Sequence, residues 1–306
     1  MGRLVAVGDI HGCAETLRLL LERLNLAAGD SLVAIGDLSS RGIDSRSVHQ
    51  QLIDLEASGV RVITLLGNHE AFLLGLQRFL GADVDLSHLP ESIFQDAEMA
   101  FLLRRNGCWA TLKSYGFEGV DDKRFWIFDR QQPRHQFERI VDEIAQMDWR
   151  LPQQHLDFLS RSRLYHIERN CLFVHAGMDP GAMVHGDAHR AVKWQIEEDP
   201  KELCWNRNWL GTTPAFPELL IHGHTPLPCL YQRLEDTDPW KDDELLFQSV
   251  VHNGSLNLDS GAFLDAGHLT AVDIPEDGDL RHLQFLRVPR VDPVEKDRLW
   301  FMNHVS

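Results

Sequence analysis

Three short apolar stretches near the N-terminus each run into a polar motif and then into a segment with helical periodicity. The stretches are 4–7, 32–35 and 60–66, and the helical patterns after them are 13–24, 45–55 and 70–80. In the first of these segments, Leu17, Leu20, Leu21 and Leu24 fall at helical spacing. Strands that alternate with helices predict a parallel arrangement with right-handed crossovers. We therefore expect an α/β fold.

The alternation breaks at residue 81. Residues 81–150 are rich in Phe, Trp, Gln, Arg and Asp and contain no clear strand pattern. We expect a mostly helical insertion there, which forms either a cap over the strand ends or an elaborated surface subdomain. Residues 178–217 are expected to be loop and short helix. Beyond the insertion the pattern predicts a helix at 151–160, strands at 171–174, 219–221, 247–252, 255–258, 268–274 and 283–288, and a surface tail from Pro289. We expect one domain over 1–306.

Polar motifs stand where the predicted strands end. They are GDIHG (8–12), GDLSSRG (36–42), GNHE (67–70), HAG (175–177) and HGHT (222–225). Ligands of open α/β sheets bind at this edge. Asp9 and His11 are two residues apart, so in an extended strand end both project to one side. Mixed carboxylate, imidazole and amide donors suit Mn²⁺, Fe or Zn²⁺ better than Ca²⁺. We expect a metal site, because two ions that share a carboxylate are a common device for cleaving phosphoesters.

Composition narrows the class of protein. The 306 residues are 43% hydrophobic and 25% charged, as in an ordinary globular protein, and no apolar run reaches the ~18 residues of a membrane span. A formal net charge of −16 argues against binding to a nucleic acid polymer. Strand pattern begins right after Met1-Gly2-Arg3, so we expect no secretory signal. Five scattered cysteines, without a CxxC pair, indicate a reducing compartment, and we expect a cytoplasmic protein.

The five motifs, in this order, resemble those of the calcineurin-like metallophosphoesterases. The similarity is greatest to the phosphoprotein phosphatase branch and its bacterial relatives, including the symmetrical dinucleoside tetraphosphatases. Further similarity lies in segments 105–116, 203–207 and 257–261. The resemblance implies a β-sandwich of two mixed sheets flanked by helices. It also implies a binuclear metal-dependent phosphatase, in which a metal-bridging water attacks phosphorus.

The resemblance also implies roles for individual residues. Ligands of the first metal would be Asp9 and His11, the bridging ligand Asp37, and ligands of the second metal Asn68, His175 and His224. His69 matches the general acid that protonates the leaving oxygen. Arg41 and Arg207 match phosphate-binding arginines, and Asn68 would also contact substrate. The expected cofactors are two divalent ions, with Mn²⁺ first and Fe or Zn²⁺ as alternatives. For His222 we expect a structural role, and for Asp259 a turn role is at least as plausible as a catalytic one.

Ser40 departs from the family pattern, because protein phosphatases of this branch usually carry an Asp there that orients the catalytic His. A Ser can accept a hydrogen bond from imidazole but brings no charge, so it would stabilise imidazolium less. The symmetrical dinucleoside tetraphosphatases resemble this chain in lacking that Asp. The HGHTP, Arg-Asn-Gly and Trp-Asn-Arg segments favour a phosphatase. We therefore expect a serine/threonine protein phosphatase, with a dinucleoside tetraphosphatase (diadenosine tetraphosphate to two ADP) or a catalytically silent binding module as alternatives.

Overall fold

The first of two sheets carries the three N-terminal strands. The computed structural model describes residues 2–95, 97, 106–117, 134–146, 149–209, 212–227 and 251–293. The sheet has the order β10-β9-β1-β2-β3. Its strands are β1 (Leu4–Val7), β2 (Ser31–Ala34), β3 (Arg61–Thr64), β9 (His268–Ile274) and β10 (Gln284–Pro289). Strands β1, β2 and β3 are parallel, while β9 runs antiparallel to β1 with Leu4 opposite Ile274.

The second sheet comes from the C-terminal half of the chain. It has the order β4-β5-β6-β8-β7. Its strands are β4 (Tyr165–Glu168), β5 (Cys171–Val174), β6 (Leu219–His222), β7 (Val251–His252) and β8 (Ser255–Asn257). Strands β5, β6 and β8 are parallel, and the edge strands β4 and β7 are antiparallel to their neighbours. Both sheets are therefore mixed.

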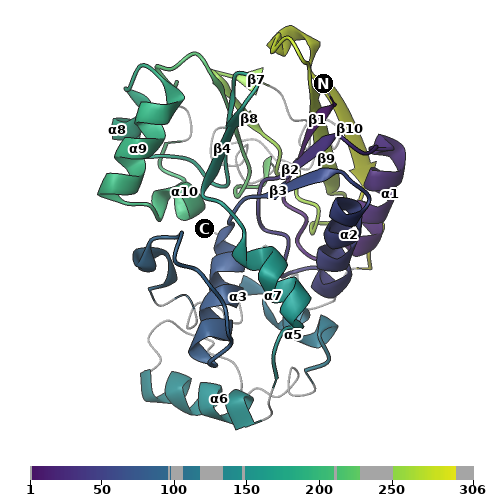
Figure 1. Ribbon diagram of the computed structural model, residues 1–306, viewed down its shortest axis with the longest axis vertical. Helices are drawn as coiled ribbons and strands as arrows, with labels where there is room; N and C mark the ends of the chain where they lie inside the picture. Colours follow the sequence, from purple (N-terminus) through teal and green to yellow (C-terminus); the bar gives the residue numbers. More distant parts are fainter. Residues whose placement is uncertain are drawn as a thin grey trace.

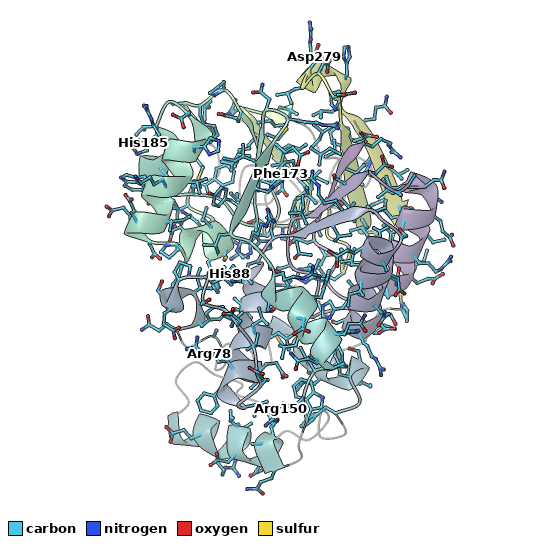
Figure 2. All side chains as sticks on the ribbon, viewed as in Figure 1. Arg78, His88, Arg150, Phe173, His185 and Asp279 are labelled. Carbon is cyan, nitrogen blue, oxygen red and sulfur yellow. The ribbon has the colours of Figure 1, made fainter. Side chains whose placement is uncertain are left out.

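A layer of apolar side chains joins the two sheets. Leu4, Ala6 and Val33 of the first sheet lie in one buried cluster with Phe173 and Ile221 of the second. In Figure 2, Phe173 lies in the interior between the two sheets. Side chains alternate along a strand, so the neighbouring residues of β1 and β2 face the opposite way and join a second core cluster with the helices. Burial on both faces explains why these strands read as continuous apolar runs.

Helices cover the outer faces of the sandwich (Figure 1). Helix α1 packs on β9 and β10 of the first sheet, while α8 and α9 lie beside the second. The helices are α1 (Ala14–Leu24), α2 (Ser45–Ala57), α3 (Asn68–Phe79), η1 (Glu91–Phe94), α5 (Trp109–Ser114), α6 (Arg134–Gln146), α7 (Gln153–Ser160), α8 (Pro180–Met183), α9 (Ala188–Glu198), α10 (Glu202–Trp205) and η5 (Leu280–His282). The two-sheet sandwich flanked by helices, expected from the sequence, is confirmed.

Several elements differ from the sequence-based expectation. Strand β4 was not expected, and the segment expected as loop and short helix contains the eleven-residue α9, which begins where the Asp187 carboxylate accepts from the Arg190 N–H. The described parts of 81–150 contain helices, namely η1, α5 and α6. Arg105, Cys229, part of the expected strand 247–252 and most of the tail lie outside the described residues. Within the described ranges, no helix combines the length and apolar character needed to cross a bilayer.

Candidate metal centre

The edge where the strands end gathers polar residues from all five motifs. They are Asp9 and His11 after β1, Asp37 after β2, Asn68 and His69 after β3, His175 after β5, and His224 after β6. Each is buried, with exposures between 0% and 7%. Because β1 to β3 belong to one sheet and β5 and β6 to the other, the cluster lies where the two sheets meet.

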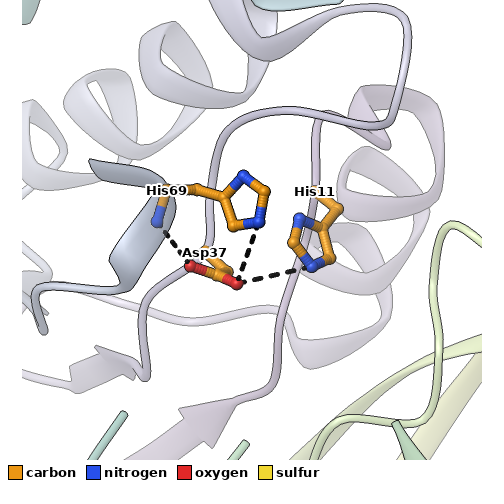
Figure 3. A group of neighbouring side chains, drawn as sticks. All are labelled: His11, Asp37 and His69. Carbon is orange, nitrogen blue, oxygen red and sulfur yellow. Dashed lines mark hydrogen bonds and ion pairs between the residues drawn. The ribbon is translucent and has the colours of Figure 1, made fainter. Parts of the chain in front are cut away.

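Two histidines face one oxygen of Asp37. Nε2 of His11 lies 3.5 Å from Oδ2 of Asp37, and Nε2 of His69 lies 3.8 Å from the same oxygen. The backbone N–H of His69 also donates to Oδ1 of Asp37 at 3.1 Å. Figure 3 shows both rings directed at this carboxylate. Nε2 of His11 also lies 4.0 Å from Oδ2 of Asp9. The two donors of the first motif therefore lie together on one side of Asp37.

The other oxygen of Asp37 faces a second group. Nε2 of His175 lies 3.3 Å from Oδ1 of Asp37, 3.3 Å from Oδ1 of Asn68 and 3.2 Å from Nδ1 of His224. Ligand atoms of Asp37, His175 and His224 fall within 4.8 Å of one another, as do those of His11, Asp37 and His69. Asp37 therefore stands between two groups of donors, as a shared ligand would.

The positions of the protons on the His175 and His11 rings indicate that both groups of donors can bind cations. Nδ1 of His175 lies 2.9 Å from the carbonyl oxygen of Ile35, and a carbonyl only accepts, so Nδ1 carries the proton. Nε2 then presents a lone pair to the oxygens of Asn68 and Asp37. His11 repeats the arrangement, since its Nδ1 faces the Ser39 carbonyl at 3.1 Å. Lone pairs directed at one another are unfavourable until a positive charge lies between them, so this donor set fits divalent cations.

Burial also makes the metal-free cluster electrostatically unfavourable. Desolvation raises the pKa of Asp9 well above its usual range, and the neighbouring Asp259 and Asp37 carboxylates raise it further. Desolvation likewise raises the pKa of Asp37 and lowers that of His175 to about 3. Both directions disfavour charge in the isolated site. A bound cation reverses this preference, because it stabilises carboxylates and neutral imidazoles as ligands.

Two arginines lie next to the cluster. The guanidinium of Arg41 stacks 4.3 Å from the ring centroid of Phe263, and that of Arg207 donates to the backbone oxygen of His224 at 3.2 Å. Both positive charges act to lower the pKa of Asp37. Guanidinium groups bind phosphate oxygens bidentately. The structure therefore brings the two predicted phosphate-binding side chains to the predicted metal ligands.

The remaining candidates occupy different surroundings. The ring of His222 packs edge-on against Trp209, with centroids 4.6 Å apart, and burial lowers its pKa to about 4. Asp259 is buried and its Oδ1 accepts from the Gly261 N–H, which is a turn contact, yet its charge also raises the pKa of Asp9. His222 is thus a packed side chain, whereas Asp259 combines a turn with electrostatic influence on the centre.

Sequence reasoning did not anticipate the backbone conformation of the site. Asp37, Ser40, Arg41, His11 and His224 all have positive φ values, between 48° and 73°. Residues other than Gly rarely adopt this conformation, which costs of order 1–3 kcal/mol per residue in strained cases. The signal available in the sequence was only indirect, namely the glycines beside each motif. Three of these residues, His11, Asp37 and His224, are predicted metal ligands.

Gly223 tests how tightly the centre is packed. A Cβ atom at this position would lie 2.0 Å from Oδ1 of Asp9, so Gly223→Ala must displace that carboxylate and its hydrogen bonds from the His224 N–H. We expect metal affinity to fall by about 10- to 100-fold, the cost typical of losing an outer support of a ligand. Metal content after dialysis measures this.

Gly186→Ala is the matched control, because a Cβ there meets nothing within 4 Å. It should retain the metal content of the unmodified protein. Equal metal affinity in the two variants would contradict the packing argument.

Known proteins resemble this chain both in sequence and in fold. A family model described as calcineurin-like phosphoesterase matches residues 2–250. A symmetrical bis(5'-nucleosyl)-tetraphosphatase from Stutzerimonas stutzeri (strain A1501) is 44% identical over 72 residues, which cover 23% of this chain and 25% of that protein. The Shewanella-like protein phosphatase 1 of Plasmodium berghei (strain Anka) is 35% identical over 81 residues, 22% of each chain. These matches therefore span about a quarter of the curated relatives.

Similarity of fold extends over nearly the whole chain. A crystal structure described as "a putative diadenosine tetraphosphatase" superposes with a TM-score of 0.50 at 21% identity. The superposition covers 94% of this chain and 93% of the other. At this identity the likeness concerns the fold.

Proposed function

The chain belongs to the calcineurin-like phosphoesterase family, and we propose that it hydrolyses phosphoester bonds through a binuclear metal centre. The observation that carries this proposal is the position of Asp37, whose two oxygens face separate groups of histidines. Asp9, His11 and Asp37 would hold one ion, and Asp37, Asn68, His175 and His224 the other. Mn²⁺ is the expected metal, with Fe or Zn²⁺ as alternatives.

We assign phosphate binding and proton delivery to side chains of the protein. Bound divalent ions supply Lewis acidity toward phosphate oxygens and lower the pKa of water. We assign Arg41 and Arg207 to holding and orienting the phosphate, and Asn68 to contacting it. His69 would deliver a proton from Nε2, which faces the centre, to the leaving oxygen. The buried surroundings strengthen each of these electrostatic contacts.

Two substrate classes fit this site. Dinucleoside tetraphosphates are favoured by the segment shared with the Stutzerimonas stutzeri protein and by Ser40, which stands where protein phosphatases usually carry a carboxylate. Cleavage to two ADP expels a phosphate group, which is a weak base and needs little protonation. A phosphoserine side chain leaves as a strongly basic alkoxide and needs an efficient proton donor.

Phosphorylated serine or threonine in proteins is the second class. It is favoured by the segment shared with the Plasmodium berghei protein phosphatase and by the Pro226 that follows the HGHT motif, as in protein phosphatase-like members of the family. Four buried free cysteines among the described residues fit a reducing compartment, and we place the activity in the cytoplasm.

One competition assay separates the classes. The Mn²⁺-loaded protein is given diadenosine tetraphosphate and a phosphoserine peptide at equal concentrations, and the products are resolved by chromatography. Two ADP as the main product would support nucleotide hydrolysis, and phosphate released from the peptide would support a protein phosphatase. A folded, metal-loaded protein that turns over neither substrate nor a simple aryl phosphate would contradict the proposed activity.

A further inference from the structure

A buried thiol lies on the far side of the His69 ring from the metal ligands. Sγ of Cys108 is 3.9 Å from Nδ1 of His69, and the hydroxyl of Ser40 donates to the same sulfur at 3.4 Å. All three residues are buried, with exposures of at most 1%. Nε2 of His69 meanwhile faces Oδ2 of Asp37 at 3.8 Å. The ring is thus held between a sulfur at one nitrogen and the centre at the other.

Backbone contacts fix the thiol in this place. Cys108 immediately precedes α5, and the carbonyl of Gly107 accepts from the Arg41 N–H at 3.0 Å. One turn into the helix, the hydroxyl of Thr111 accepts from the Ser40 N–H at 3.0 Å. The start of α5 is therefore attached to the loop that carries Arg41. A residue anchored in this way can orient its neighbour reproducibly.

We propose that Cys108, supported by Ser40, is the positioning residue for His69, and that its thiol keeps the proton of the ring on Nε2. This inference rests on the proposed role of His69 as proton donor. It assigns to a neutral sulfur the orienting task for which related phosphatases use a carboxylate at the position of Ser40.

The thiol and a carboxylate differ in what they can donate. A carboxylate only accepts, so beside a neutral imidazole it selects the tautomer with the proton on Nδ1 and leaves Nε2 bare. A thiol accepts from Nδ1–H when the ring is charged and donates to Nδ1 when the ring is neutral. Nε2 therefore carries a proton in both states before the reaction. When the charged ring delivers that proton to the leaving oxygen, the ring becomes neutral and keeps its Nδ1 proton, which the sulfur accepts, whereas a neutral ring donates only a hydrogen bond from Nε2. Burial raises the pKa of Cys108 to about 12, so the S–H donor persists at neutral pH.

Ser40 completes the arrangement. Its hydroxyl donates to the sulfur, which occupies a lone pair and leaves the single S–H proton for one of two acceptors, Nδ1 of His69 or the carbonyl oxygen of Asn106, each 3.9 Å from the sulfur. Sulfur hydrogen bonds are weak and this one is long, so the expected contribution is modest. We expect roughly a tenfold effect on proton delivery, at the lower end of what supporting partners of a functional side chain contribute.

The first test reads the ring directly and needs no turnover. Two-bond ¹H–¹⁵N spectra of Zn²⁺-loaded protein report which nitrogen of His69 is protonated, with its signals assigned by their loss in His69→Gln. We expect the Nε2–H tautomer in the unmodified protein and a mixture in Cys108→Ala. Cys108→Ser, which keeps a donor near the same place, should lie closer to the unmodified protein. An unchanged tautomer in Cys108→Ala would overturn the proposal.

The second test compares leaving groups. p-Nitrophenolate leaves without a proton, whereas phenolate is more basic and benefits from one. We expect Cys108→Ala to lower kcat for phenyl phosphate about tenfold and for p-nitrophenyl phosphate less than about twofold. Cys171→Ala, at a buried thiol between the sheets, is the control for loss of packing and should affect both substrates equally.

An equal loss on both substrates in Cys108→Ala would assign the thiol a packing role only and overturn the proposal. If His69→Gln itself shows no dependence on the leaving group, the proton-donor role of His69 fails instead. The ring spectra would then still decide whether Cys108 sets the tautomer, so the two failures are distinguishable.

Discussion

Replacing Asp37 with Asn is expected to abolish hydrolysis and to empty the metal centre. Both oxygens of this carboxylate face imidazole nitrogens of separate groups, at 3.5 Å from His11 and 3.3 Å from His175. An amide removes the negative charge shared by both groups while conserving shape and the acceptor for the His69 N–H. We expect turnover to fall at least about 100-fold, because losing a shared ligand should cost no less than the upper end of the cost of losing an outer support of a ligand. Metal stoichiometry and kcat measure the effect.

Asp44→Asn is a suitable control, because Asn caps a helix as well as Asp, and the Asp44 side chain serves as the cap of α2 by accepting from the Ser47 N–H. It should leave metal content and rate unchanged. Full metal content with normal turnover in Asp37→Asn would exclude a shared-ligand role.

In the metal-free protein, Asp37→Asn should stabilise the fold rather than destabilise it. Burial raises the pKa of Asp37 in the folded protein above its unfolded value, so the folded state holds the proton more tightly. The contribution of Asp37 to the free energy of unfolding of the metal-free protein is therefore fully present below the ordinary aspartate pKa. It is lost as the pH rises through the pKa of Asp37 in the folded protein. In chelator, Asp37→Asn should melt at or above the unmodified protein near pH 8, with a smaller difference near pH 4.

Removing the guanidinium of Arg41 is expected to weaken phosphate binding without releasing metal. The group stacks on Phe263 beside the centre, and a charge-assisted hydrogen bond contributes about 1.5–3 kcal/mol. Arg41→Ala should therefore raise the inhibition constant of inorganic phosphate by about 10- to 100-fold, with a comparable fall in kcat/KM. Metal content at saturating Mn²⁺ should stay normal.

Two variants control for charge. Arg161→Ala removes the same charge from an exposed pair with Glu56 and should have no effect. Arg41→Lys keeps the charge but loses bidentate geometry, so it should fall between the extremes. An unchanged phosphate constant in Arg41→Ala would leave Arg207 as the principal phosphate-binding side chain.

Buried strands were the most predictable part of this fold. The apolar stretches 4–7, 171–174 and 268–274 match β1, β5 and β9 residue for residue, because these strands are largely covered on both sides. Strand β4 escaped prediction because its residues are half-buried at an edge and include His166 and Glu168. Helix α9 was not predicted, because the segment 178–217 that contains it also contains several prolines and glycines. The order of the motifs was sufficient to predict the metal-donor residues, because the ends of adjacent parallel strands meet at one edge of a sheet.

Contacts between distant elements could not be predicted. Cys108 and His69 are 39 residues apart and meet only because the start of α5 is attached to the Arg41 loop. The left-handed backbone of Asp37 and His224 is likewise invisible in the residue types, because such conformations are imposed by surrounding structure. The sequence identified Ser40 as a departure from the family pattern, but it did not indicate which residue replaces the missing carboxylate.

The pairing of β1 with β9 has a consequence for biosynthesis. Strand β1 emerges from the ribosome long before its antiparallel neighbour β9, which begins at His268. Until then β1 has a bare edge, which is a template for intermolecular pairing. The cation donors are also spread from Asp9 to His224, so an incomplete chain cannot assemble the full set. Ion capture would thus mark completed molecules, and truncated products should remain both metal-poor and prone to aggregate.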